Sequence, residues 1–420
     1  MLKLKILVFI GISTLCLNSY ARKRLTPTAA PDGKMVIGYY PFWVAERGLL
    51  LKDSLYARLT HINYAFSNLS ENGECFLGNR AADVERVYSK EESVTGKNDE
   101  SSAAFHGNFN QLLELKKQDP GLKVLISIGG WEWSGNFSKA ARDDASRKRF
   151  AGSCIALYLK QYGGVFDGLD IDWEFPVSGG MTAGDAADKD NVTLLLQEIR
   201  SQLNQLAQEE NRRYLLTIAA PISANEIRNY DLPGVAASVD WINLMAYEFH
   251  GSWDTTTNFN APLYHASKDP SDTSVNVDAA VRTYLAAGVP AEKLVLGLPF
   301  YGNGWAGVAD VDHGLYQPAQ GHAPGTYEEG SYDFNDLQKN YLPVWGSYWS
   351  EEAQVPWLYD PSSQIFISYD DARSLEAKAR YARDQNLAGV MIWEISQGDE
   401  TLMDGIYRGL EIGAPKKIVP

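Results

Sequence analysis

Three acidic residues at intervals of two, Asp170, Asp172 and Glu174, are the residues of this chain whose types and spacing point most directly to chemistry. Successive side chains of a β-strand point to opposite faces, so a strand here would place all three carboxyl groups on one face. Neighbouring carboxylates on that face would lie about 6–7 Å apart along the backbone. Buried together they cannot all ionise cheaply, and we expect the pKa of at least one to be raised.

A carboxylic acid with a raised pKa beside an ionised carboxylate is the equipment for glycoside hydrolysis. The alternative is an edge strand whose acids face water. The apolar residues around the acids, which include Phe166, Trp173 and Phe175, would make a poor exposed edge. On the residues alone, two carboxylates this close favour a retaining enzyme in which Asp172 is the nucleophile.

The scaffold that positions these acids is predicted from seven further apolar runs, which alternate with helical patterns. Strands that alternate with helices form a parallel sheet, and eight near-continuous apolar strands predict an α/β fold, a closed (β/α)8 TIM barrel. Besides the acidic stretch, the predicted strands cover residues 35–43, 61–66, 123–131, 214–221, 239–247, 294–300 and 387–394. The main predicted helices cover residues 110–118, 142–162, 191–210, 276–287 and 369–386.

The interval between the seventh and eighth predicted strands is far too long for one helix. Residues 302–366 are rich in Gly, Pro, Tyr and Trp and predict a small α+β insertion domain, with the barrel at 35–301 and 367–412. The insertion contains a G-x-G-x-x-G pattern at 302–307, but this follows a late strand and precedes no amphipathic helix, so a nucleotide site has little support.

The first 21 residues predict a signal peptide, with an early lysine pair, an apolar run and a small-residue cleavage site, and residues 22–34 predict a tether. The protein is therefore expected to be secreted, either extracellular or periplasmic. We also expect a monomer. Its formal net charge of −15 argues against nucleic acid or an anionic membrane as a partner. After cleavage only Cys75 and Cys154 would remain, and the sequence leaves open whether they pair.

Barrel active sites lie at the C-terminal ends of the strands. Those ends carry acids within a ring of aromatic residues, which suits a neutral sugar whose ring faces stack and whose hydroxyls accept hydrogen bonds. The residues at these positions are Tyr39, Trp43, Phe66, Trp131, Glu174, Met245, Tyr247, Glu248, Tyr301, Trp305, Trp393 and Glu394. The six histidines show no metal-ligand spacing, and no G-x-S-x-G pattern supports a serine hydrolase. We therefore expect neither a metal nor a cofactor.

Four motifs resemble those of the family 18 glycoside hydrolases, the chitinases and their relatives, and they come in the same order along the chain. They are SIGG at 127–130, DGLDIDWE at 167–174, MAY at 245–247 and Trp393. The resemblance runs from about residue 36 to residue 399. It implies that the partner is chitin or an oligosaccharide of N-acetylglucosamine.

The resemblance also implies roles for the site residues. Glu174 would be the general acid and then the base. Asp172 would orient the N-acetyl group of the substrate, Asp170 would share a proton with Asp172, and Tyr247 would bond the same acetamido group. The substrate's acetamido oxygen, rather than Asp172, would then be the nucleophile. The implied substrate-binding residues are Tyr39, Phe66, Gly130, Trp131, Met245, Glu248, Trp253 and Trp393.

Two further points follow from the resemblance. Glu248 stands where the family usually has Asp, so its carboxylate lies on a longer arm. Non-proline cis peptide bonds are expected at 65–66, 174–175 and 393–394. The function predicted is hydrolysis of β-1,4 bonds between N-acetylglucosamine units. The alternatives are an endo-β-N-acetylglucosaminidase acting on glycoprotein or peptidoglycan glycans, and a catalytically weak chitin-binding lectin.

Overall fold

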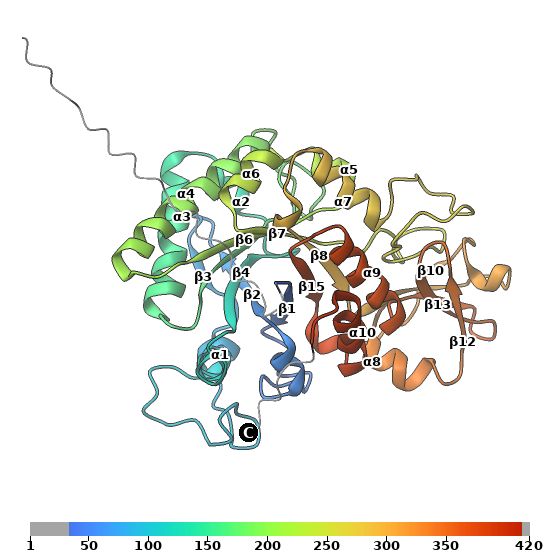
Figure 1. Cartoon of the computed structure of the whole chain (residues 1–420), viewed down its shortest axis with the longest axis horizontal. Coiled ribbons are helices and arrows are strands. Elements are labelled where there is room, and N and C mark those ends of the chain that lie inside the picture. The colour runs from blue at the N-terminus through green and yellow to red at the C-terminus, as the bar shows by residue number, and fades with distance from the viewer. Residues whose placement is uncertain (1–32, 414–420) are drawn as a thin grey trace, which may run out of the picture.

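Eight parallel strands close into a barrel in the computed structural model, which describes residues 33–413 (Figure 1). Closure is complete because the first strand pairs with both the second and the last. The strands are β1 (Met35–Pro41), β2 (His61–Leu69), β4 (Lys123–Gly129), β5 (Gly168–Asp172), β6 (Leu215–Ala220), β7 (Trp241–Leu244), β8 (Leu294–Pro299) and β15 (Gly389–Trp393). The predicted (β/α)8 barrel is thus confirmed. The predicted signal peptide and most of the tether lie outside the described residues.

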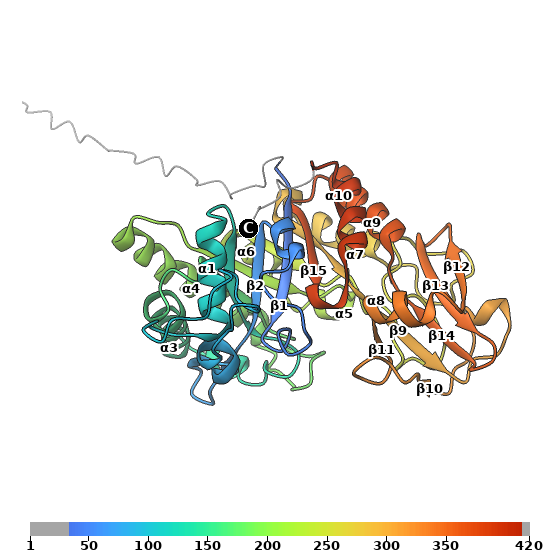
Figure 2. The same ribbon diagram turned by 90° about the horizontal axis from the view of Figure 1, so that it is seen from below.

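Helices surround the barrel in both views (Figures 1 and 2). The longer ones are α1 (Gly107–Gln118), α3 (Asp144–Cys154), α4 (Asp188–Glu210), α7 (Val277–Ala286), α9 (Ala372–Asp384) and α10 (Glu400–Leu410). A π-helical segment, Ile155–Gln161, continues α3, which accounts for the single long helix predicted there. The sequence did not predict α6 (Leu232–Ser238) or α10. Between residues 33 and 413, no helix has the length and apolar character needed to cross a membrane.

The strand that carries the acids lies inside the sheet, with β4 on one side and β6 on the other. This excludes the alternative of an edge strand whose acids face water. The apolar residues of β5, Leu169 and Ile171, belong with Trp173 just beyond it to the large core between the strands and the helices. Asp170 faces the barrel interior, where it meets side chains of four other strands. The alternation predicted from the sequence is therefore present, with the acidic face turned inward.

A second, antiparallel sheet lies beside the barrel and next to α9 (Figure 1). Its strands are β9 (Tyr301–Ala306), β10 (Gly321–His322), β11 (Ser331–Asp333), β12 (Gly346–Ser350), β13 (Val355–Asp360) and β14 (Ile365–Ser368). In the sequence they fall between β8 and β15. A separate apolar cluster, which includes Trp305, Val308 and Trp357, packs within this unit. The glycine-rich stretch at 302–307 forms most of β9 and opens no helix.

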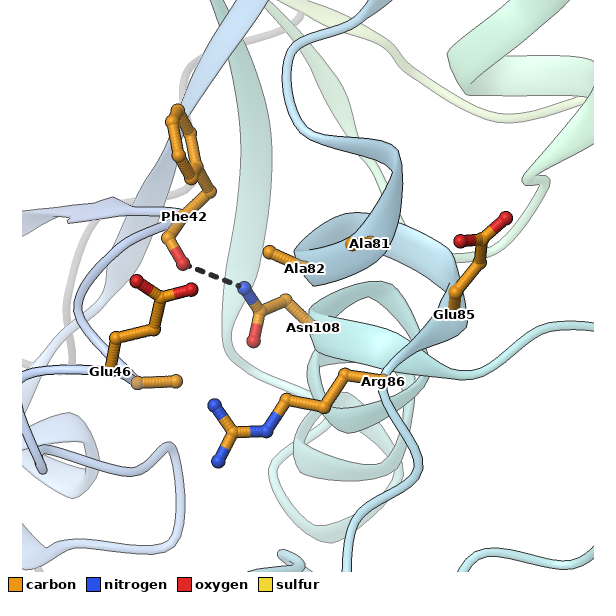
Figure 3. Close-up of a pocket in the computed structure, with 8 residues that line it drawn as sticks. Phe42, Glu46, Ala81, Ala82, Glu85, Arg86 and Asn108 are labelled. Atoms are coloured by element: carbon orange, nitrogen blue, oxygen red, sulfur yellow. Dashed lines mark hydrogen bonds between the residues drawn. The ribbon is translucent and has the colours of Figure 1, made fainter.

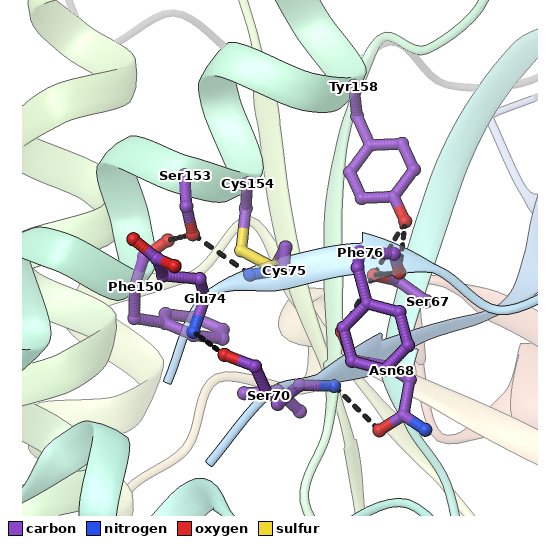
Figure 4. The surroundings of a disulfide bond; sticks show 11 residues. Ser67, Asn68, Ser70, Glu74, Cys75, Phe76, Phe150, Ser153, Cys154 and Tyr158 are labelled. Carbon is purple, nitrogen blue, oxygen red and sulfur yellow. Dashed lines mark hydrogen bonds between the residues drawn. A yellow bond between two sulfur atoms is a disulfide. The ribbon is translucent and has the colours of Figure 1, made fainter. Parts of the chain in front are cut away.

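Cys75 and Cys154 form a disulfide, which settles the question that the sequence left open (Figure 4). Cys75 begins β3 (Cys75–Leu77), a short strand antiparallel to β2, and Cys154 ends α3. The backbone N–H of Cys75 also donates to Ser153 Oγ, 3.0 Å away. The polar stretch after β2 is thus tied to the helix that follows β4.

Removing this disulfide should destabilise the fold. It closes a loop with a sequence separation of 79 residues. The chain-entropy model gives about 4.5 kcal/mol for a loop of this size. We expect Cys75→Ala/Cys154→Ala to lower the free energy of unfolding by an amount of this order, measured by urea denaturation without reductant. Dithiothreitol should destabilise the wild type and leave the double variant unchanged. Coincident unfolding curves for the two oxidised proteins would contradict the prediction.

Candidate active site

Asp170 occupies the centre of the site, fully buried inside the barrel. Its Oδ2 accepts hydrogen bonds from the hydroxyls of Tyr39 on β1 at 2.6 Å and Ser127 on β4 at 2.8 Å. Its Oδ1 accepts from Thr217 on β6 and from Asn243 Nδ2 on β7, the latter at 3.3 Å. Burial raises the pKa of Asp170, and these four hydrogen bonds oppose the rise. Four other strands therefore fix this carboxylate in place.

Asp172, at the end of β5, is also buried, but its carboxyl group has fewer hydrogen-bond partners than that of Asp170. Its Oδ1 has no hydrogen-bond partner among the described residues. Burial, followed by the negative charges of Glu174 and Asp170, raises the pKa of Asp172 well above its ordinary value. This carboxyl group therefore favours a bound proton and is ready to accept a hydrogen bond from a ligand.

The spacing of two had suggested that Glu174 lies within the strand. It lies beyond the strand instead, because β5 ends at Asp172. Its backbone N–H donates to the side chain of Ser134 at 2.8 Å instead of to a neighbouring strand. Glu174 is partly exposed, yet the protein around it, together with the charge of Glu248, raises its pKa to about 8. At neutral pH this side chain mostly holds its proton, as a general acid must.

The three cis peptide bonds expected from the resemblance are present. They join Ala65 to Phe66, Glu174 to Phe175 and Trp393 to Glu394. Each lies at or just after the C-terminal half of a barrel strand, β2, β5 or β15.

The segment after β7 carries Met245, Tyr247 and Glu248. Tyr247 is buried, and the pKa of its hydroxyl is raised first by burial and then by the charges of Asp172, Glu248 and Glu174. The Tyr247 hydroxyl therefore lies within electrostatic reach of both catalytic candidates. Glu248 adopts a left-handed φ of 60°, and its Oε1 accepts a hydrogen bond from the Tyr301 hydroxyl at 2.8 Å.

The aromatic residues predicted to bind substrate lie at three depths. Tyr39 and Phe66 are buried and pack on Trp393, with ring centroids 5.5 and 5.8 Å away. Trp393 itself is partly accessible. Trp131 and Trp253 are 50% and 56% exposed. Tyr39 and Phe66 thus pack against Trp393, which is more exposed than either, and the two outer tryptophans are open to solvent.

Gly130, next to Trp131, is required by its surroundings. Its φ is 84°, and a Cβ added there would lie 2.9 Å from the Phe66 ring. Glycine is the residue that tolerates both conditions.

Two surface hollows lie away from these residues. One, of about 320 Å³, is lined by Phe42, Ala45, Glu46, Ala81, Ala82, Glu85, Arg86 and Asn108 (Figure 3). The other, of about 700 Å³, is lined mainly by residues of α9 and α10. Neither contains a predicted site residue. Among residues 33–413 no cluster of His, Cys, Asp and Glu is arranged to hold a metal.

Sequence reasoning assigned no role to four polar residues that the structure brings to the acids. They are Ser127, Thr217 and Asn243, which bond Asp170, and Ser134, which bonds Glu174. The first three are isolated polar residues in otherwise apolar strand runs, and that interruption is the signal that could have found them.

The chain matches known proteins over nearly its whole length. The family described as "Glycosyl hydrolases family 18" matches residues 35–398. Chitinase A1 of Niallia circulans is 41% identical over 96% of this chain, which spans 63% of that protein's length. Chitinase 1 of Aphanocladium album is 35% identical and aligns over 89% of this chain and 84% of its own length.

Solved structures agree with these relatives. The catalytic domain of psychrophilic chitinase B from Arthrobacter TAD20 superimposes with a TM-score of 0.84 at 34% identity, covering 92% of this chain and 97% of that domain. The region matched by the family contains the three acids Asp170, Asp172 and Glu174. It also contains Tyr247 and Trp393. The chain therefore belongs to glycosyl hydrolase family 18.

Proposed function

We propose that this protein is a chitinase that hydrolyses β-1,4 bonds between N-acetylglucosamine units. The observation that carries the proposal is the pair formed by Glu174 and Asp172. Glu174 is a partly exposed acid whose pKa is raised to about 8, and Asp172 is a buried carboxyl group with one oxygen that has no partner in the described part of the chain. Relatives named chitinases, aligned over most of this chain, support chitin as the substrate.

Glu174 performs the proton transfers in this proposal. The protonated carboxyl group gives its proton to the glycosidic oxygen as the bond to C1 breaks. The resulting carboxylate then removes a proton from the water that attacks C1, which returns Glu174 to its starting state. A pKa near 8 suits both directions because the energies of the two forms are close at neutral pH.

Asp172 and Tyr247 hold the acetamido group. Asp172 Oδ1, which bonds no other group within residues 33–413, accepts the acetamido N–H, and the Tyr247 hydroxyl donates to the carbonyl oxygen. That oxygen then attacks C1 from the face opposite the leaving group, and water opens the ring intermediate with net retention. Asp170, fixed by its four donors, shares a proton with Asp172 and so adjusts the charge beside the positively charged intermediate.

The aromatic residues provide the sugar-binding surface. Trp393 forms the floor of the subsite where the bond is cut, and the exposed faces of Trp131 and Trp253 stack on sugars on the product side. We also propose that the protein is secreted through the predicted signal peptide at 1–21. The Cys75–Cys154 disulfide supports this, because such bonds persist in oxidising compartments.

Replacing the acid tests the function directly. Glu174→Gln keeps the shape of the side chain and removes the transferable proton, so hydrolysis of N-acetylglucosamine oligomers should slow by at least about 100-fold. Product release is measured by chromatography and oligomer binding by calorimetry, and binding should persist in the variant. A wild type that binds oligomers without cutting them would instead indicate a lectin. One that ignores them and trims glycoprotein glycans would indicate the other hydrolase.

The pH dependence should follow the proton on Glu174. Because the pKa is raised, the acid form predominates below about pH 8, and kcat/KM should fall as the pH rises through that value.

The charge of Glu248 contributes to this raised pKa of Glu174. Glu248→Gln should therefore lower the pKa of Glu174 and move the alkaline limb of the kcat/KM profile to lower pH. Glu209→Gln, near the end of α4, removes the same charge away from the C-terminal ends of the strands. This control should leave the alkaline limb in place. An unmoved limb in Glu248→Gln would contradict this account.

The identity of the nucleophile can be decided by inhibition. A thiazoline analogue of chitobiose mimics the bicyclic intermediate formed by the acetamido group. We expect it to inhibit competitively and much more tightly than chitobiose itself, as analogues of reactive intermediates do. Isolation of a glycosyl ester on Asp172 by mass spectrometry would refute the acetamido mechanism and return that carboxylate to the role of nucleophile.

A further inference from the structure

The side chain of Ser134, in the segment after β4, contacts the backbone that links Asp172 to Glu174. It is 6% exposed. Its Oγ accepts the hydrogen bond of the Glu174 N–H at 2.8 Å. Its single proton is shared between the carbonyl oxygens of Gly130 at 2.9 Å and Asp172 at 3.1 Å. One hydroxyl thus touches both ends of the three-residue segment from Asp172 to Glu174.

This contact replaces the sheet hydrogen bonds that end with β5. The Asp172 carbonyl still accepts from the Gly130 N–H at 2.8 Å, but the Glu174 N–H donates to Ser134 Oγ. The approach at this point is close, since a Cβ added at Gly129 would lie 2.2 Å from the Asp172 carbonyl oxygen. Ser134 therefore anchors the backbone of Glu174 where the ladder no longer does.

The same hydroxyl closes the turn that presents Trp131. Besides the bond from Ser134, the Gly130 carbonyl accepts from the Trp133 N–H at 3.2 Å. Trp131, half exposed, lies within this turn. The surface offered to a sugar ring and the backbone that carries the acid are thus joined through one side chain.

We propose that Ser134 is a positioning residue for the proton transfer, setting the orientation of Glu174 relative to Asp172. The inference rests on the proposed glycosidase function. Without the hydroxyl, the Glu174 N–H loses its partner and the segment after β5 is free to shift. A displacement of about 1 Å at a reacting group costs roughly 100-fold in rate, so a loss of this order in kcat/KM is the upper expectation.

The test compares two substrates that differ in their need for an acid. N-acetylglucosamine oligomers have a leaving group that must be protonated, whereas a dinitrophenyl chitobioside has one that leaves as the anion. Ser134→Ala should reduce kcat/KM on the oligomers by about 10- to 100-fold, with a much smaller effect on kcat/KM for the dinitrophenyl substrate. This parameter excludes the later step in which Glu174 acts as a base on both substrates. Partial misfolding would lower both rates equally, so the ratio between substrates does not depend on the folded fraction.

Three further variants complete the experiment. Ser134→Thr retains the hydroxyl and should recover most of the oligomer activity. Ser134→Cys keeps the size with a weaker donor and acceptor and should share the signature of Ser134→Ala. Ser138→Ala removes a comparable serine hydrogen bond, to Asp188 at 2.8 Å, and should leave the substrate ratio unchanged. Equal losses on both substrates, or no loss at all, would overturn the inference. A wild type that cuts neither substrate would overturn the proposed function and this inference with it.

Discussion

Burial of acids at the end of a single strand is the constraint on which the structure depends. A carboxylate removed from water without hydrogen bonds or a counter-charge is strongly disfavoured. This protein meets the requirement unequally along the row. Asp170 accepts four hydrogen bonds, Asp172 has one oxygen without a partner among residues 33–413, and Glu174 stays partly exposed. Hydrogen bonding to the carboxyl groups thus decreases along the row towards the open end of the barrel, and the roles proposed for the three acids rest on this difference.

A closed barrel is well suited to supply these partners. The donors to Asp170 come from β1, β4, β6 and β7, and only a sheet that curves back on itself brings those strands around one point. The opposite face of β5 is fixed by apolar packing, since Leu169, Ile171 and Trp173 lie in the core shared with the helices. The hydrophobic core thus stabilises the strand while its inner face carries groups that are costly to bury.

Much of this could be predicted from the sequence. The period of two in the acidic row and the alternation of apolar runs with helices are local patterns, and they were enough for the barrel and its acids. The expectation that Asp172 and Tyr247 bind the acetamido group, and that of the three cis bonds, came only from the family resemblance. Three of the four partners of Asp170 were missed: Ser127, Thr217 and Asn243 each interrupt an apolar run, but which group they would bond becomes clear only when the barrel closes. The pairing of Cys75 with Cys154 was left open because a separation of 79 residues carries no geometric information.

Helix α6 was missed because it is short and begins with Leu232-Pro233-Gly234, a sequence more typical of a turn. The boundaries of the insertion domain and the roles of the substrate-binding residues remain predictions.

The pairing of β1 with β15 has a consequence for how the protein is made. The first strand to emerge during synthesis acquires one of its two neighbours only when the last strand arrives, after the whole second sheet has been produced. Until then β1 presents an unpaired edge, and Tyr39 on that strand cannot be locked into place around Asp170. Nascent chains that end before β15 would therefore be open sheets with exposed apolar surface, prone to associate with one another or to be captured by chaperones. Completion of the active site is thus tied to the synthesis of β15.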